Sequence, residues 1–279
     1  MIELYEKISF EISKIITKTY STSFSIATGL LDKDQRDAIY AIYGFVRLAD
    51  EIVDTFHNFD KKKLIEDFED DLKYALENQI SCNPVLFAFA KTVKKYKIPQ
   101  DQIDAFLWSM RRDLEKEKYT TTEEIKQYIY GSADVVGLMC LRVFVDGDEE
   151  KYRQLCEPAM RLGSAFQKVN FLRDLRFDAN DLNRTYFPQL VENDFTEEVK
   201  KELIQDILYD FEAAKIGIKK LPGKSRFAVL TAYFYYRALT SKIEKIPAEE
   251  ILKRRISVHN FIKFLLIIKA YFVYRFNLL

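Results

Sequence analysis

Asp50 and Asp54 lie four residues apart in the segment AIYGFVRLADEIVDTF, which has the apolar periodicity of a helix. This spacing places both carboxylates on one helical face about one turn apart, and Arg47 lies one turn earlier. Unpaired carboxylates on so apolar a helix are costly unless a cation or a water-filled cavity receives them. By itself the pattern fits a metal site and a solvated acidic face with an Arg47 salt bridge equally well.

The segment GSAFQKVNFLRDLRFD carries a second polar pattern. Four side chains at spacings of three, four and four share one helical stripe about 80° wide, namely Gln167, Asn170, Asp174 and Asp178. Apolar residues occupy broadly the opposite side, and amides and short carboxylates stand where a solvated face would carry Lys and Glu. The stripe therefore predicts the lining of a cavity, with a solvated face as the alternative.

Two helices that each present carboxylates one turn apart suit Mg²⁺, with Mn²⁺ as an alternative, because such ions prefer oxygen ligands and share substrate phosphates with few protein carboxylates. Diphosphate is the substrate group that fits. Arg47 and Arg173 lie next to the acidic positions and would neutralise a departing diphosphate, and Ser21 and Ser23 would donate hydrogen bonds to its oxygens. The pattern predicts ionisation of a carbon–oxygen bond without an acid or nucleophile side chain.

The composition limits the elements that position these residues. The 279 residues include only 8 Gly and 6 Pro, too few for the turns of a sandwich or barrel, so an all-α protein is expected.

The charge balance and the reactive residues exclude several kinds of function. Lys+Arg 43 balances Asp+Glu 43, and net charge therefore predicts no nucleic-acid partner. The three cysteines, Cys82, Cys140 and Cys156, form no CxxC pattern, so reduced thiols are expected. The chain has only two histidines, which argues against a Ser-His-Asp triad and against a metal site built from several histidines.

Hydrophobic periodicity predicts helices joined by short turns, and almost no segment alternates like a strand. No Gly/Ser-rich linker or internal repeat interrupts the chain, so residues 1–279 are expected to form a single helical domain enclosing a central cavity. The predicted helices span residues 3–18, 33–56, 61–78, 84–96, 100–117, 122–145, 149–177, 197–219, 224–244 and 258–276.

The two ends of the chain bear on localisation. The N-terminus is amphipathic with early acidic residues, unlike a signal peptide, so a cytoplasmic protein is expected. Near the C-terminus, Lys263, Lys269 and Arg275 divide the most apolar stretch into uncharged runs of five residues, far short of the ~20 needed to cross a bilayer. A terminal helix packed on the domain is the preferred interpretation, and peripheral membrane docking is the alternative.

The chain resembles the squalene/phytoene synthases, the head-to-head prenyltransferases of the all-α isoprenoid-synthase fold. The resemblance covers most of the chain in the family's order and rests on STSFS at Ser21, LADEIVD at Asp50, YIYGSADVVG at Tyr128, QKVNFLRDLRFD and LNRTYFP at Pro188. One departure is Asp134, at a position where the family commonly has glycine.

The resemblance implies a role for each matching position. Metal ions and diphosphates would be held by Asp50, Asp54, Asp174 and Asp178, with Asn170 as a further ligand. Arg47 and Arg173 would contact diphosphate. Tyr128, Gln167 and Asn170 would line the reaction centre.

The resemblance also implies a reaction in which two geranylgeranyl diphosphates condense through a cyclopropyl intermediate to phytoene, the first step of carotenoid synthesis. It places the STSFSIAT helix along the tunnel for the prenyl tails, with Phe24 nearest the substrate and the small Thr28 leaving room for an extra five-carbon unit. Neither a nicotinamide cofactor nor a protein partner is then required. Farnesyl diphosphate condensation to squalene or dehydrosqualene is the alternative.

Two further functions remain open at this point. A head-to-tail prenyl synthase or terpene cyclase would share the fold, but the NxxxDxxxD pattern at Asn170 argues against both. A non-catalytic helical scaffold docked to membranes would explain the apolar terminus but not the polar stripe.

Overall fold

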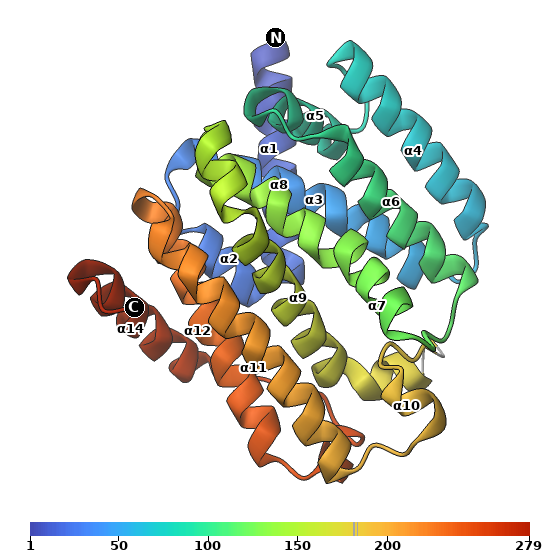
Figure 1. The fold of residues 1–279 in the computed structure, drawn as a ribbon. Helices are drawn as coiled ribbons and strands as arrows, with labels where there is room; N and C mark the ends of the chain where they lie inside the picture. Colours follow the sequence, from blue (N-terminus) through green and yellow to red (C-terminus); the bar gives the residue numbers. More distant parts are fainter. Residues whose placement is uncertain (181, 183) are drawn as a thin grey trace.

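The computed structural model describes residues 1–180, 182 and 184–279, and within these ranges it contains no β-strand. The predicted all-α class is confirmed (Figure 1). From the N-terminus the elements are α1 (Ile2–Tyr20), α2 (Thr22–Thr28), α3 (Lys33–Asp54), α4 (Lys61–Asn78), α5 (Pro84–Tyr96), α6 (Gln100–Glu115) and α7 (Thr122–Ile129). They continue with the π-helical turn η1 (Tyr130–Asp134), α8 (Val135–Phe144), α9 (Glu149–Asn180), α10 (Gln189–Glu192), α11 (Glu197–Lys220), α12 (Gly223–Lys245), α13 (Ala248–Ile251) and α14 (Asn260–Phe276).

Helix starts follow the local sequence. Asn83 caps α5, its side chain accepting a hydrogen bond from the backbone N–H of Val85 at 3.0 Å, and Pro84 occupies the first turn, where no N–H is needed. Thr121 and Thr196 cap α7 and α11 in the same way. These caps satisfy N–H groups that have no partner inside the helix, which is why the ends are so well marked in the sequence.

The prediction of one helix over 122–145 is wrong, because η1 interrupts it. A Cβ on Gly131 would lie 2.5 Å from the carbonyl oxygen of Ala105, so only glycine lets this turn approach α6 so closely. A π turn changes the direction in which later side chains point. Tyr128 before it and Val136 after it both line the central cavity.

The hydrophobic periodicity also missed α2. This helix has seven residues, too few for a periodic pattern, and Ser21 caps it by accepting a hydrogen bond from the N–H of Phe24.

Two large apolar clusters hold the helices around the cavity. In the first, Phe45 of α3 stacks on Phe89 of α5 with ring centroids 4.0 Å apart and packs against Phe106 of α6. The second joins α9 to α11 and α12, with Phe211 of α11 at its centre. In Figure 1, α3–α6 lie on one side of the molecule and α11 and α12 lie on the other. Both sides contribute to the lining of the cavity, α3 and α6 from the first and α9, α11 and α12 from the second.

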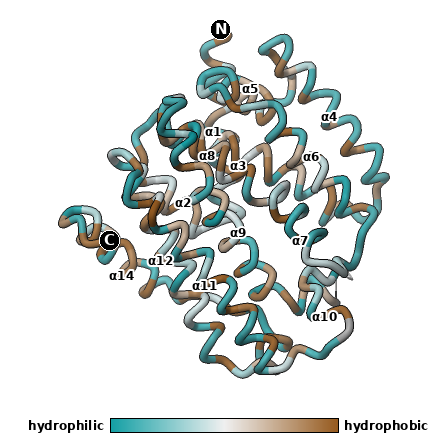
Figure 2. The backbone as a smooth tube through the Cα atoms, viewed as in Figure 1, coloured by the Kyte–Doolittle hydropathy of each residue, from teal (hydrophilic) through white to brown (hydrophobic). Residues whose placement is uncertain are grey.

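Helix α14 packs on α12 at the edge of the molecule, as the sequence predicted for the terminal helix. Ala270 is fully buried in this contact. Hydrophobic residues recur along the whole of α14 (Figure 2). None of the described helices is both long enough and apolar enough to cross a membrane.

Candidate active site

A cavity of about 1090 Å³ lies between α2, α3, α8, α9 and α12. This volume is slightly above the usual range of ~300–1,000 Å³ for small-molecule pockets. Carboxylates and guanidinium groups line one part of it, and apolar side chains such as Val136, Phe144 and Leu155 line another. The cavity therefore suits a large ligand with a charged head and an apolar tail.

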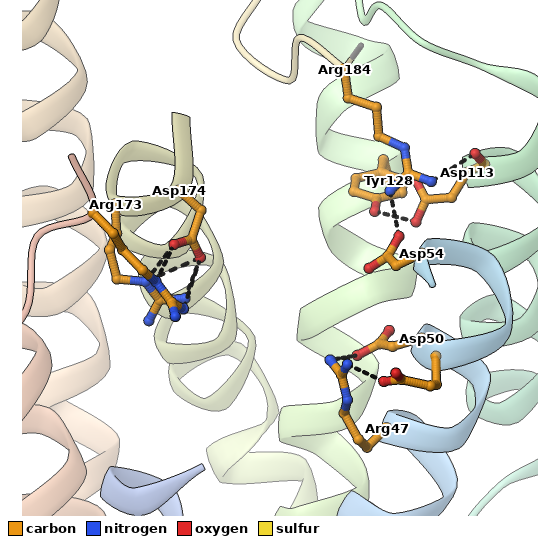
Figure 3. Close-up of polar contacts among 10 residues, drawn as sticks. Arg47, Asp50, Asp54, Asp113, Tyr128, Arg173, Asp174 and Arg184 are labelled. Carbon is orange, nitrogen blue, oxygen red and sulfur yellow. Dashed lines mark hydrogen bonds and ion pairs between the residues drawn. The ribbon is translucent and has the colours of Figure 1, made fainter. Parts of the chain in front are cut away.

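On one side of the cavity, α3 presents Asp50 and Asp54 (Figure 3). Arg47 is held beside them: it donates to Glu51, lies 4.0 Å from the Asp50 carboxylate, and its guanidinium stacks over the Tyr20 ring at 4.3 Å. Burial and then the negative charge of Asp54 raise the pKa of Asp50 to about 8. A cation between the two carboxylates would relieve that cost.

On the other side, α9 presents the whole polar stripe predicted from the sequence, so its interpretation as a cavity lining is confirmed. Arg173 donates to the Asp174 carboxylate at 3.1 Å, and Arg255, from the segment after α13, donates to the same carboxylate at 2.7 Å. Asn170 accepts a hydrogen bond from the Tyr236 hydroxyl at 3.2 Å. Two guanidinium groups therefore flank Asp174, and their positive charges would attract a bound anion.

The two acidic sides face each other. Burial raises the pKa of Asp178 to about 7, and the next largest contributions are the negative charges of Asp174 on its own helix and of Asp54 on α3. Among the described residues, no three His, Cys, Asp or Glu side chains meet closely enough to hold a metal ion by themselves. Separated carboxylate pairs fit Mg²⁺, which usually takes one or two carboxylates and completes its shell with water and substrate phosphates.

A third group connects α3, α6 and α7, and two of its members, Asp113 and Arg184, were absent from the sequence prediction. The Tyr128 hydroxyl donates to the Asp113 carboxylate at 2.7 Å (Figure 3). Arg184 donates to the Asp54 carboxylate at 2.7 Å and to the backbone carbonyl oxygen of Asp113 at 2.9 Å. Burial raises the pKa of Asp113 to about 7, against the opposing positive charge of Arg184. Tyr128, predicted as a site residue, is thus held against the cavity by a buried ionic network.

One sequence signal could have revealed part of this group. Asp113 lies three residues after Met110 and seven after Phe106, which places its carboxylate on the buried face of α6. A carboxylate on an apolar face requires a partner. Arg184 follows α9 in a segment without periodicity, so nothing local predicts its position.

Of the residues predicted around the substrate, Ser21, Phe24 and Thr28 line the cavity. Phe24 stacks on Tyr43 with ring centroids 4.9 Å apart, and Thr28 is buried. Ser23 does not line the cavity. Ser21 is the extended N-cap of α2 and Ser23 lies within its first turn, so their side chains take different directions.

Asp134, the departure from the family pattern, is also accounted for. It ends η1 and accepts a hydrogen bond from the Ser164 hydroxyl of α9 at 2.7 Å, while burial raises its pKa to about 7. Gly163 lets α9 pass beside it, since a Cβ there would lie 2.8 Å from the Ala133 carbonyl oxygen. Asp134 therefore ties η1 to α9 outside the cavity lining.

Residues 17–261 match the family model described as squalene/phytoene synthase. The chain belongs to the squalene/phytoene synthase family. It is 29% identical to a chloroplastic phytoene synthase of Zea mays over 260 residues, which cover 84% of this chain and 62% of that protein. It is 28% identical to a phytoene synthase of Arthrospira platensis, with 85% of this chain and 84% of that protein covered. The chain thus spans about three fifths of the plant member and most of the other.

Solved structures support the fold. A ligand-bound dehydrosqualene synthase has a TM-score of 0.80 at 22% identity, with 98% of each chain covered. A squalene synthase from Alicyclobacillus acidocaldarius has a TM-score of 0.76 at 20% identity, with 91% of this chain and 97% of that chain covered. The helical arrangement of this family of synthases is therefore that of the present chain.

Proposed function

We propose that this protein condenses two prenyl diphosphates head to head through a cyclopropyl diphosphate, with geranylgeranyl diphosphate as donor and phytoene as product. The observation that carries the proposal is that carboxylate pairs on α3 and α9 border the same large cavity, whose remaining lining is mostly apolar. Membership of the squalene/phytoene synthase family supports it. We further infer that residues 1–279 act as one domain, because residues from Tyr20 to Arg255 line this one cavity.

Four aspartates would hold Mg²⁺ through their oxygens, with Asn170 as a further ligand: Asp50, Asp54, Asp174 and Asp178. When bound, Mg²⁺ would supply positive charge against the diphosphate leaving group. Arg47, Arg173 and Arg255 supply further positive charge at the same end of the cavity. The apolar part excludes water and orients the two chains, so departure of diphosphate generates a carbocation that meets the second prenyl chain before water.

Aromatic groups border the place where that cation would form. The rings of Tyr128 and Phe171 stack with centroids 6.3 Å apart, and both residues line the cavity. The negative face of an aromatic ring attracts a cation. Burial is the first cause that raises the pKa of Tyr128, followed by the charge of Asp113, so its hydroxyl stays protonated at neutral pH. It can then donate a hydrogen bond to Asp113 without adding negative charge.

Donor length is assigned from the apolar part of the cavity. Thr28 is buried there, and its small side chain leaves the space that a longer tail requires. Farnesyl diphosphate, and a squalene or dehydrosqualene product, is the second candidate, favoured by the dehydrosqualene synthase structure with the TM-score of 0.80. Phytoene formation requires no reductant, so no nicotinamide cofactor is proposed.

Thr28→Phe should shift preference from the twenty-carbon to the fifteen-carbon donor. Overfilling a packed pocket costs about 1–3 kcal/mol, which corresponds to roughly a 5- to 150-fold change in relative kcat/KM. The measurement is kcat/KM for both donors. Thr28→Val is the matched control, because it keeps the volume and should keep the preference. An unchanged preference in Thr28→Phe would show that this position does not limit tail length.

Arg47→Lys should lower kcat/KM about tenfold, because a guanidinium grips two phosphate oxygens and an ammonium cannot reproduce that geometry. Arg36→Lys on the same helix is the control, since Arg36 pairs with Asp37 at 3.9 Å and does not line the cavity. If Arg47 serves only its ion pair with Glu51, both variants will retain full activity.

Product analysis tests the function itself. Purified protein is incubated with Mg²⁺ and either the fifteen- or the twenty-carbon diphosphate, with and without a nicotinamide reductant. We expect a forty-carbon phytoene and released diphosphate, independent of reductant. A thirty-carbon product would support the second candidate instead, and release of diphosphate with only cyclic or head-to-tail products would contradict head-to-head condensation.

A further inference from the structure

The outer face of α14 is an exposed apolar surface. Six large side chains, each between 38% and 62% exposed, share this face, and they are Phe261, Phe264, Leu265, Ile268, Phe272 and Phe276. The opposite face is also apolar and packs on α12 through Leu266, Ala270 and Val273. A contiguous exposed apolar face of this kind usually marks an interaction site.

A groove of about 480 Å³ opens between α11, α12 and α14. Its charged side chains are the cations Lys215, Arg237 and Lys269 and the carboxylate of Glu212, which lies 3.4 Å from Lys215, and Leu279 also lines it. The remaining lining is apolar or aromatic and includes Tyr233, Phe234 and Leu266. The groove thus combines an excess of positive charge with an apolar floor.

Two of these cations have no ion-pair partner in the described part of the chain. No ion pair within the described residues involves Arg237 or Lys269, which instead lie over the rings of Phe211 and Phe234 at 5.6 and 4.5 Å. The Nη1 atom of Arg237 is buried and has no hydrogen-bond partner among the described residues. An acceptor oxygen from a ligand would satisfy it, and a guanidinium suits phosphate oxygens.

We propose that the outer face of α14 and this groove together form an attachment surface for an anionic lipid bilayer. The apolar side chains of α14 enter the acyl boundary, and Arg237 with Lys269 holds a lipid phosphate. Arg275, which is exposed on the same helix, adds to the attraction. The surface is separate from the cavity, but α12 borders both, since Val229, Ala232 and Tyr236 line the cavity from that helix.

Charge decides between a bilayer and a second copy of this chain. A two-fold contact through α14 would place the same surface on both partners, so the cations Lys269, Arg275 and Arg237 would face a surface that carries the same positive charges. Repulsion between like charges opposes that contact, whereas anionic headgroups complement it.

Vesicle flotation of the full chain tests the proposal without any substrate, so its outcome is independent of the proposed reaction. Vesicles of phosphatidylcholine are compared with vesicles that also contain phosphatidylglycerol. Wild type should bind the anionic vesicles, and the triple variant Phe261→Ser/Phe264→Ser/Phe272→Ser should lose about tenfold or more of that binding, because each Phe contributes buried apolar area. A protein that binds neither kind of vesicle overturns the proposal.

Matched controls isolate the two parts of the surface. Phe59→Ser/Tyr74→Ser removes exposed aromatics next to and within α4, on the side of the molecule away from α14, and should leave binding unchanged (Figure 1). The double variant Arg237→Gln/Lys269→Gln should lose the preference for anionic vesicles and keep a normal melting temperature. Excess inorganic phosphate should not release the wild-type protein from anionic vesicles. Retained preference in that variant overturns the assignment of the groove.

A measurement of the oligomeric state completes the test. A wild-type dimer that the triple serine variant converts to monomer, together with absent vesicle binding, would assign the surface to a second copy and overturn the proposal.

Discussion

Replacing any one of Asp50, Asp54, Asp174 and Asp178 by Asn should lower turnover at least about a hundredfold, since metal-assisted charge stabilisation contributes several kcal/mol and 1.36 kcal/mol is tenfold in rate. Each change removes a charged oxygen ligand but almost no volume. The measurement is steady-state turnover at saturating donor across a range of Mg²⁺ concentrations.

The fold should survive these four changes. Asp178 is buried, where an ionised carboxylate costs free energy, so Asp178→Asn should melt at or above the wild-type temperature. Asp54→Asn should melt lower but still fold, because it removes the ion-pair partner of the buried Arg184. Asp67→Asn on the exposed surface of α4 is the matched control and should keep full turnover, because Asp67 only pairs with Lys63 in water. Two cavity variants with near-normal turnover at saturating Mg²⁺ would contradict the proposed arrangement.

Arg184→Gln should destabilise the protein by about 3 kcal/mol or more, the usual cost of removing one partner from a buried charged group. Arg184 is only 6% exposed and donates to the Asp54 carboxylate and the Asp113 backbone. Its loss leaves Asp54 without its ion-pair partner and the buried Asp113 carboxylate without the positive charge that stabilises it. Urea unfolding followed by circular dichroism measures the change in the free energy of unfolding.

A second variant separates the charge effect from lost packing. Asp113→Asn added to Arg184→Gln removes the unneutralised charge and keeps an oxygen that accepts from Tyr128, so part of the lost stability should return. Lys63→Gln, which breaks an exposed ion pair, should cost less than about 0.5 kcal/mol. Equal stability of Arg184→Gln and wild type would show that the network contributes little to the fold.

The sequence by itself determined the helical class and the two acidic helices. Scarce glycine and proline, capping residues such as Asn83, and the spacing of Asp50 and Asp54 are all local features, and helical geometry converts four-residue spacing into a shared face. The same geometry predicted that the stripe from Gln167 to Asp178 lines a cavity. The chemical roles of these residues, Mg²⁺ binding and donor length stay predictions.

Only the tertiary structure decided which groups meet. Arg184 and Asp54 are 130 residues apart in the chain, and no local pattern relates them. Gly131 is required because the π turn lies close against α6, and a prediction of one helix over residues 122–145 could not show that contact. Ser21, the cap before α2, lines the cavity, whereas Ser23 in the first turn of that helix does not. Long-range packing, not periodicity, selects which side of each helix becomes the site.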